Sequence, residues 1–174
     1  MRSYREYNGM VVLGIDPGLA NTGFGVVESR GSVLLALDGG VIETPTGTPL
    51  ELRLAQVADR IVELIDQHRP DAMAIESIYF GKNAESAFQV GQARGAVICE
   101  AGRRAVPVHS YTPQQIKLAV CGSGAAGKGQ VQTMVTALLD LPGPVPPDHA
   151  ADALAVGICH LNSAPLASAI GAAS

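Results

Sequence analysis

The stretch VVLGIDPGLANTGFGVV, residues 11–27, decides the fold. Residues 10–16 form a continuous apolar run that ends on an aspartate, which is typical of a buried strand, and Pro17-Gly18 then forces a turn. Further β-like runs cover residues 24–28 and 33–37, with a short continuation at 41–42. Three strands this close in sequence predict an antiparallel meander.

After the meander, helical and extended patterns alternate. Apolar residues at helical spacing begin at Leu54, and His68-Arg69-Pro70 closes that helix. We expect a strand at 72–76, a long helix at 83–103 and a short strand at 105–109. The order predicts an α/β domain with a mixed central sheet of about five strands, the first three antiparallel, flanked by helices.

The last third of the chain reads as helical. Thr112-Pro113-Gln114-Gln115 has the form of an N-cap with proline at the first helical position, so a short helix starts there and stops at Gly122. The stretch GSGAAGKGQ, residues 122–130, reads as a flexible loop before another helix. After a proline-rich linker at 142–147, Asp148 is placed to cap a final helix that runs to Leu161.

Three carboxylates occupy positions where a merely structural acid is not expected. Asp16 and Glu76 each end an apolar run, and Asp152 lies in the alanine-rich segment DHAADALAVGICH. An unpaired carboxylate is costly to bury, so acids at the ends of buried strands usually face an opening and hold a cation. Hard cations such as Mg²⁺ choose oxygen ligands, and a pair of them cuts phosphodiesters by in-line attack of water. The pattern favours a metal-dependent nuclease. Taken alone, Asp16 is better read as a turn residue or helix cap.

Composition limits the remaining classes. With 174 residues and 47% hydrophobic content, the chain suits one ordered domain. No stretch has the length of a membrane span and the polar start MRSYREYNG does not read as a signal peptide, so we expect a cytoplasmic protein. The three cysteines lack metal-type spacing, which argues against zinc and for reduced residues in or near the core.

The charge is unevenly distributed. The net charge is −4, which argues at first sight against a nucleic-acid partner. Residues 81–130, however, hold six basic side chains against two acidic ones, a balance of +4, and all three lysines of the chain lie there. We read this as a nucleic-acid-binding segment, with an ordinary solvated surface as the alternative.

Four motifs then resemble one family. GIDPGLANTGFGVV, AIESIYFGKNAESAFQVGQARG, YTPQQIK and HAADALAVGICH appear in order over residues 11–161 and resemble the RuvC family of Holliday-junction resolvases in the ribonuclease H-like superfamily. The resemblance implies a homodimer that makes paired, symmetric nicks in a four-way DNA junction. It also implies two Mg²⁺ ions per active site, with Mn²⁺ able to substitute, and the branch-migration proteins RuvA and RuvB as partners.

The resemblance assigns roles to individual acids. Asp16 matches the first-strand catalytic acid, Glu76 the fourth-strand acid and Asp152 the acid of the final helix. Many members have a further aspartate where this chain has His149. Because residues 149 and 152 are spaced i and i+3, both side chains can face one site, where His149 would act as a metal ligand or as a proton donor.

The resemblance also implies DNA-binding residues. An aromatic in the Tyr79-Phe80 pair would stack at the opened crossover, and Lys82 and Asn83 follow it directly. Core packing is the competing explanation for the two rings. Two more lysines match basic positions that face DNA, Lys117 and Lys128.

Three other functions stay open from sequence. GIDPG followed by TGFG resembles the phosphate-binding turn of actin-like ATPases, although such folds need a duplicated domain. Another ribonuclease H-like nuclease would act on RNA:DNA hybrids or RNA ends, and a junction-binding protein without catalysis is the third. We expect residues 10–163 to form a single nuclease domain, with residues 1–9 as an extension and 164–174 as a flexible tail.

Overall fold

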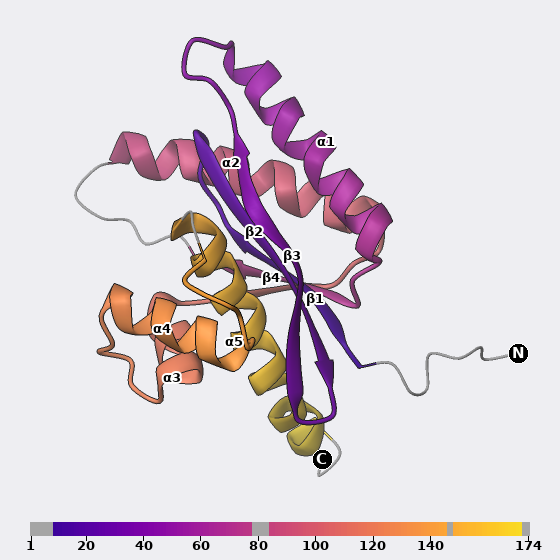
Figure 1. Ribbon diagram of the computed structural model, residues 1–174. Coiled ribbons are helices and arrows are strands. Elements are labelled where there is room, and N and C mark those ends of the chain that lie inside the picture. The colour runs from indigo at the N-terminus through magenta and orange to yellow at the C-terminus, as the bar shows by residue number, and fades with distance from the viewer. Residues whose placement is uncertain (1–8, 78–83, 146–147, 172–174) are drawn as a thin grey trace, which may run out of the picture.

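The computed structural model describes residues 9–77, 84–145 and 148–171. Within them one five-stranded sheet has the order β3-β2-β1-β4-β5 (Figure 1). The strands are β1 (Val11–Asp16), β2 (Asn21–Arg30), β3 (Val33–Glu43), β4 (Ala72–Glu76) and β5 (Val108–Tyr111). The helices of the described residues are α1 (Leu50–His68), α2 (Ala84–Arg103), α3 (Pro113–Cys121), α4 (Lys128–Leu138) and α5 (Asp148–Gly171).

The sheet is mixed, as the sequence predicts. β1, β2 and β3 pair antiparallel, whereas β4 runs parallel to β1 and β5 parallel to β4. β1 therefore lies in the middle of the sheet, and its carboxyl end is next to the carboxyl end of β4. Charged residues at these two ends meet at one edge.

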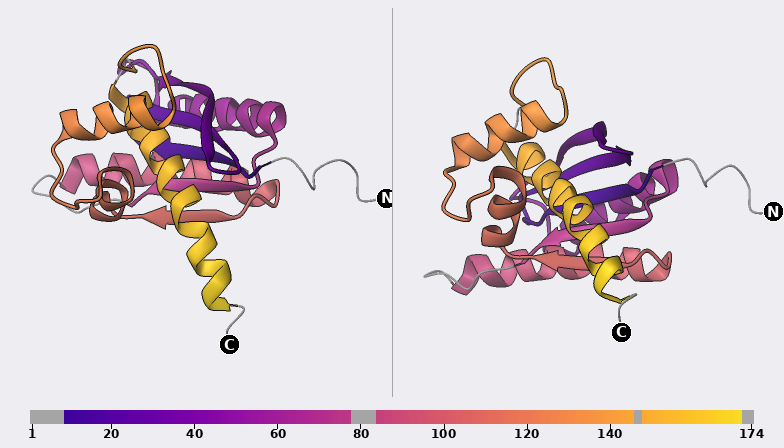
Figure 2. Two further views of the ribbon diagram at one scale, coloured as in Figure 1. Left: turned by 60° about the horizontal axis from the view of Figure 1, so that its bottom comes forward. Right: turned by 90° about the horizontal axis from the view of Figure 1, so that it is seen from below.

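Helices cover both faces of the sheet (Figures 1 and 2). α1 and α2 pack on one face around a core that includes Leu13, Ile61 and Met73. α3, α4 and α5 cover the other face around a second core that includes Val12, Val135 and Ile158. α5 crosses this face and contacts β1 and β2 directly.

The second and third strands are longer than predicted. β2 extends to Asn21 and Arg30, and β3 is one strand to Glu43 where the sequence indicates a break after Leu37. The register gives the reason: Val26 pairs with Asp38 and Val27 with Ala36, so an irregularity at this point absorbs Leu37 and lets the strand continue.

The strand predicted at 105–109 is misplaced, because in the structure β5 covers residues 108–111. The amide of Val106 donates to the carbonyl of Ala101, and Ala105 has a left-handed φ of 54°, so residues 104–107 form the turn that follows α2 and do not begin a strand. Pairing with β4 starts at Val108. The predicted capping box of α3 is confirmed, with Thr112 and Gln115 exchanging both hydrogen bonds.

Two further boundaries differ from the sequence predictions. α4 starts at Lys128, inside the segment expected to be a loop, and α5 continues past Leu161 to Gly171. All three cysteines are free, and Cys99 is exposed where a core position was expected.

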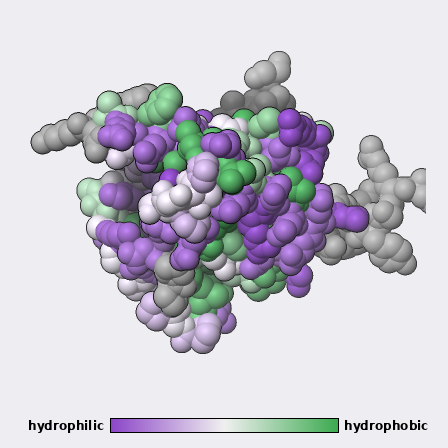
Figure 3. All heavy atoms as spheres, turned by 90° about the horizontal axis from the view of Figure 1, so that it is seen from above, coloured by the Kyte–Doolittle hydropathy of each residue, from purple (hydrophilic) through white to green (hydrophobic). Residues whose placement is uncertain are grey.

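The surface carries few large hydrophobic side chains. Seen from above, the described surface is mostly hydrophilic, with hydrophobic residues in small separate patches (Figure 3). Among the described residues, every helix falls short of the length and apolar character that would let it cross a bilayer.

Candidate metal centre

Asp16 and Glu76 end the two central parallel strands. Ile15 of β1 is in register with Ile75 of β4, so the acids that follow them lie beside each other at the same edge of the sheet. The strands before them are buried and apolar, and both carboxyl groups are only partly exposed. The fold therefore brings together two acids that are 60 positions apart in sequence, 76 − 16.

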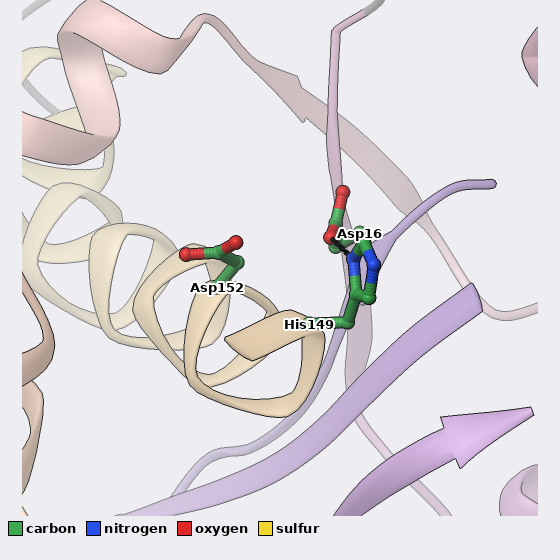
Figure 4. A group of neighbouring side chains, drawn as sticks. All are labelled: Asp16, His149 and Asp152. Carbon is green, nitrogen blue, oxygen red and sulfur yellow. Dashed lines mark hydrogen bonds and ion pairs between the residues drawn. The ribbon is translucent and has the colours of Figure 1, made fainter. Parts of the chain in front are cut away.

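α5 brings two more side chains to this edge. Figure 4 shows His149 and Asp152 on the first turns of α5, with the ring of His149 against Asp16 and Asp152 to one side of them. Nδ1 of His149 lies 2.8 Å from Oδ2 of Asp16. The ligand atoms of Asp16, His149 and Asp152 all lie within 4.8 Å of one another, and the i, i+3 spacing places both helix residues on one face, as predicted.

The acids of this centre repel one another. Burial, the charge of Asp16 and a hydrogen bond with it, and the charge of Asp152 together raise the pKa of Glu76 to about 7, against a smaller opposing effect of Lys117. Burial also raises the pKa of Asp152, opposed by the charge of Lys128. A cluster in which one carboxyl group, that of Glu76, keeps its proton up to near neutral pH is one that a cation would stabilise.

Glu76→Gln is expected to stabilise the metal-free protein at high pH. The folded-state pKa of Glu76 lies above the ordinary value of 4.5, so the folded state binds this proton more tightly than the unfolded state does. That contribution to stability is present below pH 4.5 and is lost as the pH rises through 7. In EDTA at pH 8 the variant should gain on the order of 2 kcal/mol in urea unfolding, and almost nothing at pH 4.

Glu43→Gln, at an exposed position of β3, is the matched control and should change stability little at either pH. If Glu76→Gln changed the free energy of unfolding equally at both pH values, ionisation of Glu76 would not be what destabilises the metal-free protein at high pH.

Two lysines face the acids across a pocket. A cavity of about 200 Å³ is lined by Glu76, Asp152, Lys117 and Lys128, with apolar walls from α3, α4 and α5. Nζ of Lys128 lies 3.1 Å from Asp148 and 3.7 Å from Asp152. Both lysines thus border the carboxylate cluster, where each could meet a phosphate oxygen.

The sequence missed the partners of Lys128. Asp148, expected only to cap α5, accepts a hydrogen bond of 2.8 Å from Nε2 of Gln132 and pairs with Lys128. An acid just before the catalytic motif is visible in sequence, but its partner on α4 depends on the packing of two helices.

Within the described part of the basic segment, residues 84–130, the basic side chains do not form one surface. Arg103 and Arg104 lie at the far end of α2, where each pairs with Glu100. Of the basic residues in that segment, Lys117 and Lys128 line the acid pocket. The predicted residues Tyr79, Phe80, Lys82 and Asn83 lie outside the described residues.

The donor set fits divalent metal ions. Carboxylates from β1, β4 and α5 supply the oxygen ligands that Mg²⁺ prefers, and the imidazole of His149 adds a nitrogen that Mn²⁺ accepts. One ring nitrogen of His149 lies within hydrogen-bonding distance of the carboxylate of Asp16, which restrains the orientation of the ring beside the acids.

A mixed sheet of this order, with acids at the ends of its central parallel strands and on the helix crossing them, defines a nuclease of the ribonuclease H-like fold. The family model described as crossover junction endodeoxyribonuclease RuvC matches residues 12–160. The chain belongs to the RuvC family.

Individual relatives cover nearly the whole chain. The crossover junction endodeoxyribonuclease RuvC of Pelotomaculum thermopropionicum is 48% identical over 151 residues, which cover 87% of this chain and 92% of the relative. That of Citrifermentans bemidjiense is 46% identical over 155 residues, covering 89% and 94%. Among solved structures, Thermus thermophilus RuvC in complex with Holliday junction substrate matches with a TM-score of 0.88 at 39% identity and covers 91% of this chain and 96% of its own.

Proposed function

We propose that this protein is a structure-specific endonuclease that resolves four-way DNA junctions by paired symmetric nicks, in homologous recombination and DNA repair. The single observation that carries the proposal is the cluster of Asp16, His149 and Asp152 at the end of β1, beside Glu76. The similarity to a RuvC structure in complex with Holliday junction substrate supports the choice of substrate.

The proposed centre holds two Mg²⁺ ions, for which Mn²⁺ can substitute. Asp16, Glu76, His149 and Asp152 are the proposed ligands and catalytic residues. Two such metal ions, when bound, supply an activated water and neutralise charge at the leaving oxygen of a phosphodiester. The carboxyl of Glu76 must lose its proton to serve as a ligand, so metal affinity is expected to rise as the pH rises toward and past 7.

The chain's own groups orient the substrate. A proton on Nδ1 of His149 donated to Asp16 would leave Nε2 with the free lone pair, which suits a metal ligand better than a proton donor.

Lys117 and Lys128 border the acids and are proposed to bind the backbone of the cut strand. Tyr79, Phe80, Lys82 and Asn83 are proposed, from the family resemblance, to contact the crossover.

The assembly is a proposal as well. We propose a homodimer that places one centre on each of two opposed strands, works with RuvA and RuvB, and acts in the cytoplasm, with residues 10–163 as one nuclease domain. The outer face of α2 supports a second copy as partner: Phe88 is 67% exposed, and Gly95 has open space where a side chain would lie. A helix surface with an exposed aromatic ring and a glycine allows another helix to pack closely against it.

Side-by-side cleavage of two substrates tests the function. The purified protein is incubated in Mg²⁺ with a labelled mobile four-way junction and with an RNA:DNA hybrid of the same sequence. We expect symmetric nicks in the junction and an intact hybrid. Preferential cleavage of the hybrid would support the alternative ribonuclease H-like activity.

The two pocket lysines are expected to act through phosphate contacts. Lys117→Ala and Lys128→Ala should each weaken junction binding and reduce the log–log dependence of affinity on salt by about 0.9, the value for one lost phosphate contact. Titrations by fluorescence anisotropy in EDTA at several salt concentrations measure this slope.

Arg103→Ala is the control, because Arg103 lies at the carboxyl end of α2, does not line the acid pocket, and pairs with Glu100. A slope that is unchanged in both lysine variants would remove them from the DNA interface.

A further inference from the structure

Three glycines on adjacent strands lie directly under the catalytic end of α5. In the antiparallel register Asp16 pairs with Gly23, and Gly14 pairs with Gly25. Cross-strand partners direct their side chains to the same face of a sheet. The three glycines, which we call the glycine patch (Gly14, Gly23 and Gly25), therefore lie on the same face as the carboxylate of Asp16.

Backbone of α5 occupies the space that side chains would take at these positions. A Cβ atom on Gly23 would lie 2.0 Å from the carbonyl oxygen of His149 and 3.1 Å from its Cβ. One on Gly14 would lie 2.1 Å from the carbonyl oxygen of Ala153. One on Gly25 would lie 2.7 Å from side-chain carbons of Leu154 and 2.8 Å from its amide nitrogen. Backbone cannot rotate out of the way, so a side chain at Gly14 or Gly23 moves the helix.

The patch ends at the metal centre. Gly23 is both the cross-strand partner of Asp16 and the residue beneath His149, whereas the Leu154 contact of Gly25 lies farther along α5. The 2.8 Å contact between His149 and Asp16 thus exists where the helix approaches the sheet without an intervening side chain.

We propose that Gly23 is a positioning residue of the metal centre: its missing side chain admits the backbone of His149 against the Asp16–Gly23 pair, which sets the spacing of His149 and Asp152 from Asp16. The inference rests on the proposed metal-binding function. A methyl group at position 23 lifts the first turn of α5 and separates the ligands of the two elements. Metal centres tolerate little displacement of their ligands, so affinity falls even if the fold persists.

Gly23→Ala is compared with two other glycine variants. Gly39→Ala is the neutral control, because a Cβ there would meet its nearest atom at 3.7 Å, an ordinary contact, on the strand next to β2. Gly25→Ala also crowds α5, but at Leu154 and less tightly, because its Cβ would meet its nearest atoms at 2.7 Å. Mn²⁺ binding without DNA is measured by electron paramagnetic resonance, and metal-free stability by thermal unfolding in EDTA.

We expect Gly23→Ala to weaken Mn²⁺ binding by about 10- to 100-fold, and Gly25→Ala to weaken it much less relative to its own loss of Tm. Gly39→Ala should bind as wild type does. The proposal would be overturned if Mn²⁺ affinity fell in proportion to Tm, and by the same proportion, in the Gly23 and Gly25 variants. Unfolding of both variants would also overturn it. In either case the glycine patch would be needed only for folding and not for the spacing of the metal ligands. Wild-type affinity in Gly23→Ala would overturn it too.

Failure of the proposed function gives a different result. If wild type and Gly39→Ala bind no Mn²⁺, or if Asp16→Asn binds it as well as they do, the metal centre itself is misassigned and the positioning role falls with it.

Discussion

Neutralising any one acid of the centre is expected to abolish cleavage and spare binding. Asp16→Asn, Glu76→Gln and Asp152→Asn should each lower the single-turnover rate of junction cleavage in Mg²⁺ by at least about 1,000-fold, a loss of about 4 kcal/mol in transition-state stabilisation. The reason is that metal coordination needs the negative charge of the carboxylate, whereas an amide of the same shape keeps the local packing. Gel-shift titration with the same junction in EDTA should give affinities within a few-fold of wild type, because phosphate contacts come from the basic side chains.

Glu43→Gln is the control for loss of a carboxylate at an exposed position away from the centre, and it should cleave at the wild-type rate. An acid whose variant cleaves within about tenfold of wild type, a change of about 1.4 kcal/mol, is not a core ligand. Loss of junction binding together with cleavage would indicate a role in DNA contact or folding.

Substitution of His149 is expected to separate a ligand role from a proton-donor role. We expect His149→Ala to lose about 100-fold or more in rate in either metal, since the cluster then lacks one donor beside Asp16 and Asp152. His149→Asp should stay active and shift its preference from Mn²⁺ toward Mg²⁺, because an oxygen ligand replaces a nitrogen. Cleavage rates of both variants in Mg²⁺ and in Mn²⁺ measure the effect.

The outcome for a proton donor differs. His149→Asp would then fail in both metals, because a carboxylate has no proton to donate. His109→Ala removes an exposed histidine whose ring lies tilted against that of His160, and it should leave the metal preference unchanged. Full activity of His149→Ala in Mg²⁺ would contradict both roles.

The acids of the centre could be predicted because the constraint on them is local. A buried apolar strand that ends on a carboxylate is visible in one short window, as at Asp16 and Glu76, and the i, i+3 spacing of His149 and Asp152 needs only helical geometry. The family resemblance joined these windows into one site. The structure adds the distances between them and the raised pKa of Glu76, which depend on how β1, β4 and α5 pack.

The parts that the sequence did not predict depend on contacts between distant segments. Leu37 ends a local β pattern, yet pairing with β2 carries the strand on to Glu43. Lys128 reads as loop from its glycine-rich surroundings, but it begins α4 and pairs with Asp148 on α5. Gly23 looks like one more glycine in a β-like run, and its importance emerges only when the backbone of His149 is seen above it.

Anomalous diffraction from crystals soaked in Mn²⁺ would locate the metal ions. We predict two anomalous peaks between β1, β4 and α5, within coordination distance of Asp16, Glu76, His149 and Asp152, and loss of the peaks in Asp16→Asn. Peaks elsewhere, or none here at Mn²⁺ concentrations that support cleavage, would contradict the assignment of this cluster as the catalytic metal centre.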